Sequence, residues 1–314
     1  MAYVPKSWSF EKFKNKMWET GAEVNKVTLS FLRQLLGVHK KTSNLAILGE
    51  TGKYPLSIKA YIHIFKYWSR LCTSENELLK ASKEANMALN QSGHQNWLRV
   101  IQYLLHLVDM KCDFGKNELE NKELTKIFKQ KIENIYQNWW NEKMKSTENR
   151  KLDFFFSYKK TFKFEPYLDA VPRNIRRYAT RLRTSSHSYP VETLRYCKPT
   201  IDQQDRKCTI CNTNQVGDEI HYLLNCTNYN ILNTRKTHMK ELRGTVDQFR
   251  NFSEECIIKY CLLLNDKRIL HGMSQYIKAI AEAYKEETAE KPTIKPEVTT
   301  RYGRRVKEPV KLNL

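Results

Sequence analysis

The sequence predicts a mainly α-helical fold, on three observations. Long segments carry apolar residues at helical spacing, and strand signals are few. Glycine and proline are sparse, at 10 and 9 of 314 residues, which suits helices with short connections. An apolar fraction of 40% supports a packed core. We expect a helical part over residues 1–150, a second helical part over 151–286 with a small zinc knuckle at about 205–230, and a disordered basic tail over 287–314.

The first helix that the periodicity predicts spans residues 55–71. Pro55 stands near its first turn, where a missing backbone N–H costs nothing. Ile58, Ile62, Phe65 and Trp68 fall on one face. This helix should therefore bury that face against its neighbours.

The remaining helices follow from the same reasoning. The turn signal Ser-Gly-His separates the segments 76–89 and 95–108. The long segment 119–145 is amphipathic. Its apolar stripe consists of Leu124, Phe128, Ile132, Ile135 and Trp139. Further helical segments span residues 174–183, 256–264 and 268–287.

The stretch GETGK, from Gly49 to Lys53, looks at first like a phosphate-binding loop. That loop needs four residues between its glycines and a Ser or Thr after its lysine. Here two residues intervene and Tyr54 follows the lysine. We interpret the stretch as a turn that precedes the helix at Pro55.

The charge balance points to a polyanionic partner. The chain has 54 Lys and Arg against 34 Asp and Glu, a net charge of +20. Basic side chains gain affinity for phosphates by releasing counterions. A membrane surface and incidental charge are the alternatives. The chain shows no secretory signal and no apolar run long enough to span a bilayer, so we expect a reducing compartment, the nucleus or cytoplasm, and no membrane partner.

One stretch, CTICNTNQVGDEIHYLLNC, has the spacing of a metal site. Two cysteines lie three positions apart, a histidine follows, and a last cysteine lies five positions beyond it. Paired Cys and His ligands at such spacing suit tetrahedral zinc, and four protein ligands leave no open position. A redox pair and buried thiols are the alternatives. We predict one structural Zn²⁺ ion bound by Cys208, Cys211, His221 and Cys226.

A basic segment lies just before this stretch. Between Val171 and Lys198 the only acidic residue is Glu192. Arginine binds phosphates through two hydrogen bonds, and interleaved tyrosines can stack on unpaired bases. A solvated basic helix face is the alternative. The predicted phosphate-binding residues are Arg173, Arg176, Arg177, Arg181, Arg183 and Arg195, with Tyr178, Tyr196 and Tyr222 as stacking candidates.

His187 allows three interpretations: a fifth ligand, an RNA contact or a packed histidine. Catalytic motifs are missing. YLDA, from Tyr167 to Ala170, holds a single aspartate, and neither HExxH nor GxSxG occurs. We therefore expect no enzymatic activity.

Several stretches, taken in order, resemble the region downstream of the polymerase in LINE-type non-LTR retrotransposon reverse transcriptases. The landmarks LLGV, GETGKYPL and KYW come first. They are followed by QSGHQNWLRVIQYLL, FKFEPYLDAVP, RRYATRLRTSSHSYPVETLRY and CTICNTNQVGDEIHYLLNC. The resemblance covers roughly residues 25–265.

The resemblance implies that Cys208, Cys211, His221 and Cys226 form the CCHC module of such proteins. It also implies that Arg181, Arg183 and His187 belong to a nucleic-acid-facing part. The chain contains neither the endonuclease nor the polymerase motifs of that family, so we expect a fragment of an element or a reused piece of one, with a separate polymerase protein as a candidate partner.

Together these observations predict non-catalytic binding of RNA or single-stranded DNA. A zinc-stabilised protein–protein interaction module is one alternative. A decayed element fragment with no selected role is the other.

Overall fold

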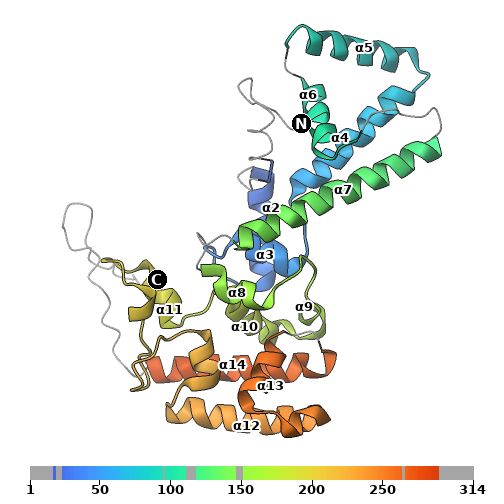
Figure 1. Ribbon diagram of the computed structural model, residues 1–314. Helices are drawn as coiled ribbons and strands as arrows, with labels where there is room; N and C mark the ends of the chain where they lie inside the picture. The colour runs from blue at the N-terminus through green and yellow to red at the C-terminus, as the bar shows by residue number, and fades with distance from the viewer. Residues whose placement is uncertain are drawn as a thin grey trace, which may run out of the picture.

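The computed structural model describes residues 17–18, 23–94, 96–110, 118–145, 151–263 and 266–289. Helices dominate this part of the chain (Figure 1). Extended pairing within it is limited to two isolated bridges, Thr51–Phe164 and Lys207–Val216. The predicted mainly α-helical class is confirmed.

The N-terminal helices form the upper part of Figure 1, where α4, α5, α6 and most of α7 extend away from the rest. The predictions over 55–71, 76–89, 95–108 and 119–145 are confirmed as α4 to α7. Asn76 and Asn96 cap α5 and α6 by accepting backbone N–H groups. The helices are α2 (Glu23–Leu36), α3 (Asn44–Thr51), α4 (Leu56–Thr73), α5 (Glu77–Gln91), α6 (Trp97–Leu107) and α7 (Glu118–Lys145).

The C-terminal helices form the lower part, where α14 lies between α10 and α12 (Figure 1). The predicted tail begins too early, because α14 continues to Ala289, and residues 290–314 lie outside the described residues. The elements are α8 (Asp153–Tyr158), α9 (Tyr167–Ala170), α10 (Arg173–Arg183), α11 (Pro190–Thr193), η2 (Leu194–Tyr196), η3 (Gln203–Asp205), η4 (His221–Asn225), α12 (Tyr229–Thr245), η5 (Asp247–Asn251), α13 (Glu254–Leu262) and α14 (Lys267–Ala289).

Buried apolar side chains from both parts form one continuous core. In α7 the fully buried residues are Phe128, Ile132, Tyr136 and Trp140, at intervals of four. The predicted stripe included Phe128 and Ile132 correctly. It chose Ile135 and Trp139, which pack only partly buried, over their buried neighbours. The predicted stripe steps by three after Ile132, whereas the buried residues continue in steps of four.

The GETGK stretch is a helix end, not only a turn. Gly49 to Thr51 close α3, and Gly52 ends it with a left-handed φ of 57°. A Cβ at Gly49 would lie 2.6 Å from the Trp140 ring, and one at Gly52 would lie 2.4 Å from the backbone N of Phe164. Both glycines therefore allow close packing. The turn lies at Gly52 and beyond.

A buried network of charges connects the N-terminal and C-terminal parts. Arg183 lies 2.7 Å from a carboxylate oxygen of Glu50 and 3.5 Å from one of Glu165, and Lys159 pairs with Glu165. All four side chains are at most 3% exposed. Arg183 also donates a 2.9 Å hydrogen bond to the carbonyl of Leu262, at the end of α13. Burial raises the pKa of Glu50, and Arg183 opposes that rise.

Replacing Arg183 with Met should lower the free energy of unfolding by about 3–5 kcal/mol, because two carboxylates would stay buried without their partner. Urea unfolding followed by circular dichroism measures this. Arg177→Met, on an exposed position of the same helix, is the control and should change stability by less than ~0.5 kcal/mol. Equal stability of the two variants would contradict the role of the network.

Candidate metal centre and basic groove

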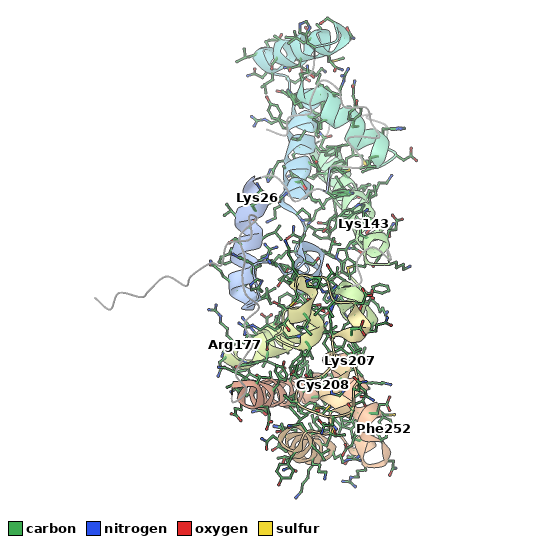
Figure 2. The ribbon with its side chains drawn as sticks, turned by 90° about the vertical axis from the view of Figure 1, so that its left-hand side faces the viewer. Lys26, Lys143, Arg177, Lys207, Cys208 and Phe252 are labelled. Carbon is green, nitrogen blue, oxygen red and sulfur yellow. The ribbon has the colours of Figure 1, made fainter. Side chains whose placement is uncertain are left out.

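Four side chains, those of Cys208, Cys211, His221 and Cys226, converge where the sequence predicts a metal site. Their ligand atoms all lie within 4.8 Å of one another. The three cysteines are free thiols. A tetrahedral zinc ion with ~2.3 Å Zn–S bonds holds its sulfurs about 3.8 Å apart, so a small closure of the cluster accommodates a metal ion. Figure 2 marks Cys208 in the lower part of the molecule.

The first ligand pair sits on a short hairpin. Cys208 N donates to the carbonyl of Gln215 at 2.8 Å, and Gly217 N donates to that of Arg206 at 2.9 Å. The tip turns at Asn214, whose φ of 54° is left-handed. Asparagine tolerates this conformation better than most residues. The polar loop between the ligand pairs thus has defined backbone pairing.

The second ligand pair depends on a π-helical turn, η4. Cys226 N donates to the carbonyl of His221 at 2.7 Å, a bond between residues five apart. In an ordinary α-helix, residues five apart point about 140° away from each other. The wider π turn brings them to one side, and such turns are frequent at functional sites. Asp218 accepts the N–H of His221 at 2.7 Å and caps the turn.

The imidazole of His221 is oriented for metal binding. Its Nδ1 lies 3.0 Å from the amide oxygen of Gln215, and its Nε2 lies 3.4 Å from Cys211 Sγ. An amide oxygen only accepts, so Nδ1 carries the proton and Nε2 is free to ligate. Metal-bound histidines generally have such a partner for the second nitrogen.

Hydrogen bonds within the cluster stabilise the thiolate form of Cys208. The hydrogen bond from Cys226 lowers the pKa of Cys208, and His221 and Tyr222 add to the effect. The hydroxyl of Tyr222 donates to Cys208 Sγ at 3.3 Å. The same pairing raises the pKa of Cys226. A bound cation would replace the proton that the two sulfurs share, because metal binding releases ligand protons.

The metal cluster is part of the core, which the sequence did not indicate. Leu223 and Cys226 are fully buried. Arg235 of α12 donates to the carbonyls of Leu223 at 3.0 Å and Cys226 at 3.2 Å, and Tyr276 of α14 donates to Leu223 as well. These bonds satisfy backbone groups at the end of η4. The knuckle is therefore held by two long helices.

The structure removes two predicted contacts from the nucleic-acid-binding set. Arg183 was expected to bind phosphate, yet it is 2% exposed and lies among carboxylates. Tyr222, a predicted stacking partner, is fully buried against the metal cluster. His187 pairs with Glu219 at 2.7 Å, and both side chains are 7% exposed. His187 is not among the four converging ligands, and it is packed against Glu219 while it also lines the groove described below.

The other predicted arginines lie at or near the surface. Arg173 and Arg177 are exposed, and Arg173 donates to the carbonyl of Gln34. The remaining three are half-buried and have partners. Arg176 donates to the carbonyl of Leu168, Arg181 donates to that of Gly37 at 2.6 Å, and Arg195 pairs with Glu192 at 2.7 Å.

Two of these arginines line a groove of ≈ 930 Å³, which we call the α10 groove. Its walls come from residues 38–42, α10, residues 185–189, the α11–η2 segment and α14. Figure 2 shows Arg177, one of its lining residues, at the edge of the molecule. Among its described lining residues Glu192 is the only acid, and Lys151 pairs with it at 3.2 Å. The basic lining residues are Lys40, Lys41, Lys151, Arg177, Arg181 and Lys285, beside His39 and His187.

An exposed aromatic ring also lines the α10 groove. Tyr196 is 52% exposed, and Lys41 Nζ lies 4.6 Å from its ring centroid. Sequence reasoning missed Lys40, Lys41, Lys151 and Lys285, which are distant from α10 along the chain. The HKK run at 39–41 was the one local signal.

No family model, curated protein or solved structure matches the chain. Within the part of the chain that the structure describes, no helix combines the length and apolar character needed to cross a membrane.

Replacing Gln215 with Ala should weaken metal binding about 10-fold or more, because His221 loses the partner that orients its ring. Competition with a chromophoric chelator measures the affinity. Gln204→Ala, at an exposed position of η3, is the control and should match the unaltered protein. Equal affinities of the two variants would contradict the orienting role of Gln215.

Proposed function

We propose that this protein binds single-stranded nucleic acid, RNA or DNA, in the α10 groove and does so without catalysis. The observation that carries the proposal is the groove itself. Cations from four separate segments line it, with one acid that is already paired. Cations gathered in a concave surface are suited to a polyanion, because each phosphate contact releases counterions.

The ring of Tyr196 favours a single strand over a duplex. A strand with unpaired bases can place one of them on the exposed ring while its phosphates meet the surrounding lysines. Bases in a duplex are already stacked and offer no free face. The ammonium groups of Lys41 and Lys151 lie over this ring, 4.6 and 5.7 Å from its centroid. A base that stacks on Tyr196 would take the place of one of them and leave that cation free for a phosphate.

The metal that we propose for the cysteine–histidine cluster is zinc, in a structural role. Three thiolates and one imidazole suit zinc, and a complete set of four ligands leaves no position for substrate. The ion would link the hairpin, which carries Cys208 and Cys211, to the η4 turn, which carries His221 and Cys226.

Contacts of the hairpin connect this metal to the groove. Val191 N donates to the carbonyl of Gly217 at 3.1 Å, and Arg206 donates to that of Val191 at 2.9 Å. A Cβ at Gly217 would lie 2.9 Å from Pro190, so the hairpin backbone packs closely on α11. The α11–η2 segment carries Tyr196. The zinc ion would therefore hold one wall of the α10 groove in place.

The order of the sequence motifs supports an origin for this function. They resemble the post-polymerase region of LINE-type reverse transcriptases, and such a fragment would act beside a separate polymerase protein. The buried roles of Glu50 and Arg183 give a structural reason for the GETG and RLRTSSH stretches. Some residues of these motifs therefore have a packing role in the core, and others are candidates for binding nucleic acid.

Elemental analysis should find about one zinc ion per chain, in line with the four-ligand site. Cys208→Ser should lose it, since a hydroxyl is a poor substitute for a thiolate. Cys256→Ser, which alters an exposed thiol, is the control and should keep the metal. Full retention of zinc by Cys208→Ser would overturn the ligand assignment.

Substituting Lys40, Lys41, Arg177 and Lys285 with Gln should weaken binding of a 20-nucleotide single strand. The plot of log affinity against log salt should become shallower by about 0.7 for each lost contact. Fluorescence anisotropy at several salt concentrations measures both. A variant with Lys53, Lys59, Lys143 and Lys145 changed to Gln removes the same charge from exposed positions outside the groove.

Equal binding by these two variants would show that net charge, not the α10 groove, attracts the strand. Recovery of partners from cell extract, with and without nuclease treatment, distinguishes nucleic-acid binding from the alternative, a protein–protein interaction module. Contacts that survive nuclease treatment would favour a protein-interaction module.

A further inference from the structure

A second basic groove lies between α4 and α7, with a volume of ≈ 560 Å³. Its lining residues include no acid and no aromatic ring. In Figure 1 these helices belong to the upper part of the molecule, whereas α10 and α14 lie in the lower part. The groove is therefore separate from the α10 groove. Its basic residues are Lys66, Arg70, Lys122, Lys126 and Lys129.

Helix packing produces this arrangement. The rings of Phe65 and Phe128 stack at 4.2 Å between centroids, and both are fully buried between the two helices. Basic residues on the solvent side of these two rings form the rims. On α4, Lys66 and Arg70 are four positions apart, which places them on one face. On α7, Lys122 and Lys126 repeat this spacing.

The two basic rims face each other without acidic neutralisation. Lys129 approaches Glu133 at 4.0 Å, at an exposed position where such a pair contributes little. Lys66, Arg70, Lys122 and Lys126 form no ion pair with any side chain that the structure describes. Like charges across a groove repel each other, and an anion between them would remove that repulsion.

We propose that the α4–α7 groove is a second nucleic-acid site, one that takes the phosphate backbone of a duplex. Residues four apart on a helix rise about 6 Å, and each strand of a duplex carries one phosphate per ~3.4 Å of the duplex axis. A rim that runs along this axis thus places a cation at roughly every second phosphate. The groove has no ring on which an unpaired base could stack, so a single strand gains no stacking energy there.

Charge density then decides in favour of the duplex. Double-stranded DNA carries one charge per ~1.7 Å of its axis, more than a single strand, and releases more counterions per contact. The two grooves thus divide their ligands: a single strand at the α10 groove, a duplex at the α4–α7 groove.

The test uses the full chain and two labelled probes, a 20-base-pair DNA duplex and a 20-nucleotide oligothymidine. Changing Lys66, Arg70, Lys122 and Lys126 to Gln should weaken duplex binding at least ~10-fold and reduce its salt slope by about 0.9 per lost contact. Binding of the single strand should change by less than about 3-fold, because its phosphates and bases lie in the α10 groove.

The control is again the Lys53, Lys59, Lys143 and Lys145 variant, which removes the same charge outside both grooves. Equal duplex binding by the control and the α4–α7 variant would overturn the proposal. A charge-preserving variant, with Lys66, Lys122 and Lys126 changed to Arg, should bind the duplex like the unaltered protein. Loss of duplex binding in that variant would also overturn it. Thermal unfolding by circular dichroism verifies that each variant is folded.

The outcome separates the two proposals. If the α10-groove variant loses both probes and the α4–α7 variant loses neither, the second site is wrong and the proposed function stands. If only the duplex responds, and only to the α4–α7 variant, the second site stands and the first is wrong. Vesicles containing phosphatidylserine are a further probe. A variant that loses vesicle binding while duplex binding is unchanged would assign this groove to lipid headgroups, against the proposal.

Discussion

The buried guanidinium of Arg183 is the interaction on which the rest of the C-terminal part depends. A charge without water costs several kcal/mol unless its partners are complete. Its partners come from the end of α3, from the segment before α9 and from the end of α13. Satisfying one side chain therefore fixes four segments relative to one another. The helix that carries it, α10, can occupy only one position in the molecule.

That position of α10 creates the basic groove. With Arg183 directed inward, Arg177 on the same helix faces solvent. Arg181 holds the carbonyl of Gly37, and Ser186 bonds both His39 N at 2.8 Å and Thr42 at 2.9 Å. These bonds draw the loop of residues 38–42, with its lysines, beside α10. The buried Arg183–Glu50 ion pair thus positions the cations of the groove, although neither side chain lines the groove.

The metal cluster supports the same groove from the other side. Its hairpin packs on α11 through Gly217, and α11 leads into the segment with Tyr196. Arg235 and Tyr276 attach the η4 turn to the helices beneath it. Metal site, groove wall and core are consequently one unit, unlike a small knuckle that folds around its ion alone.

The sequence by itself determined the helical class, most of the helices and the four converging ligands, because helical periodicity and ligand spacing are local properties of the chain. It could not distinguish Arg183 from Arg181, two residues away in the same basic run. Only the tertiary structure decided that one is buried and the other lines a groove, since burial of a charge depends on carboxylates such as Glu50, which is 133 positions distant. The lysines of both grooves likewise come from separate segments or helices. The sequence gives the number of lysines, but it does not show which of them lie near one another in the fold.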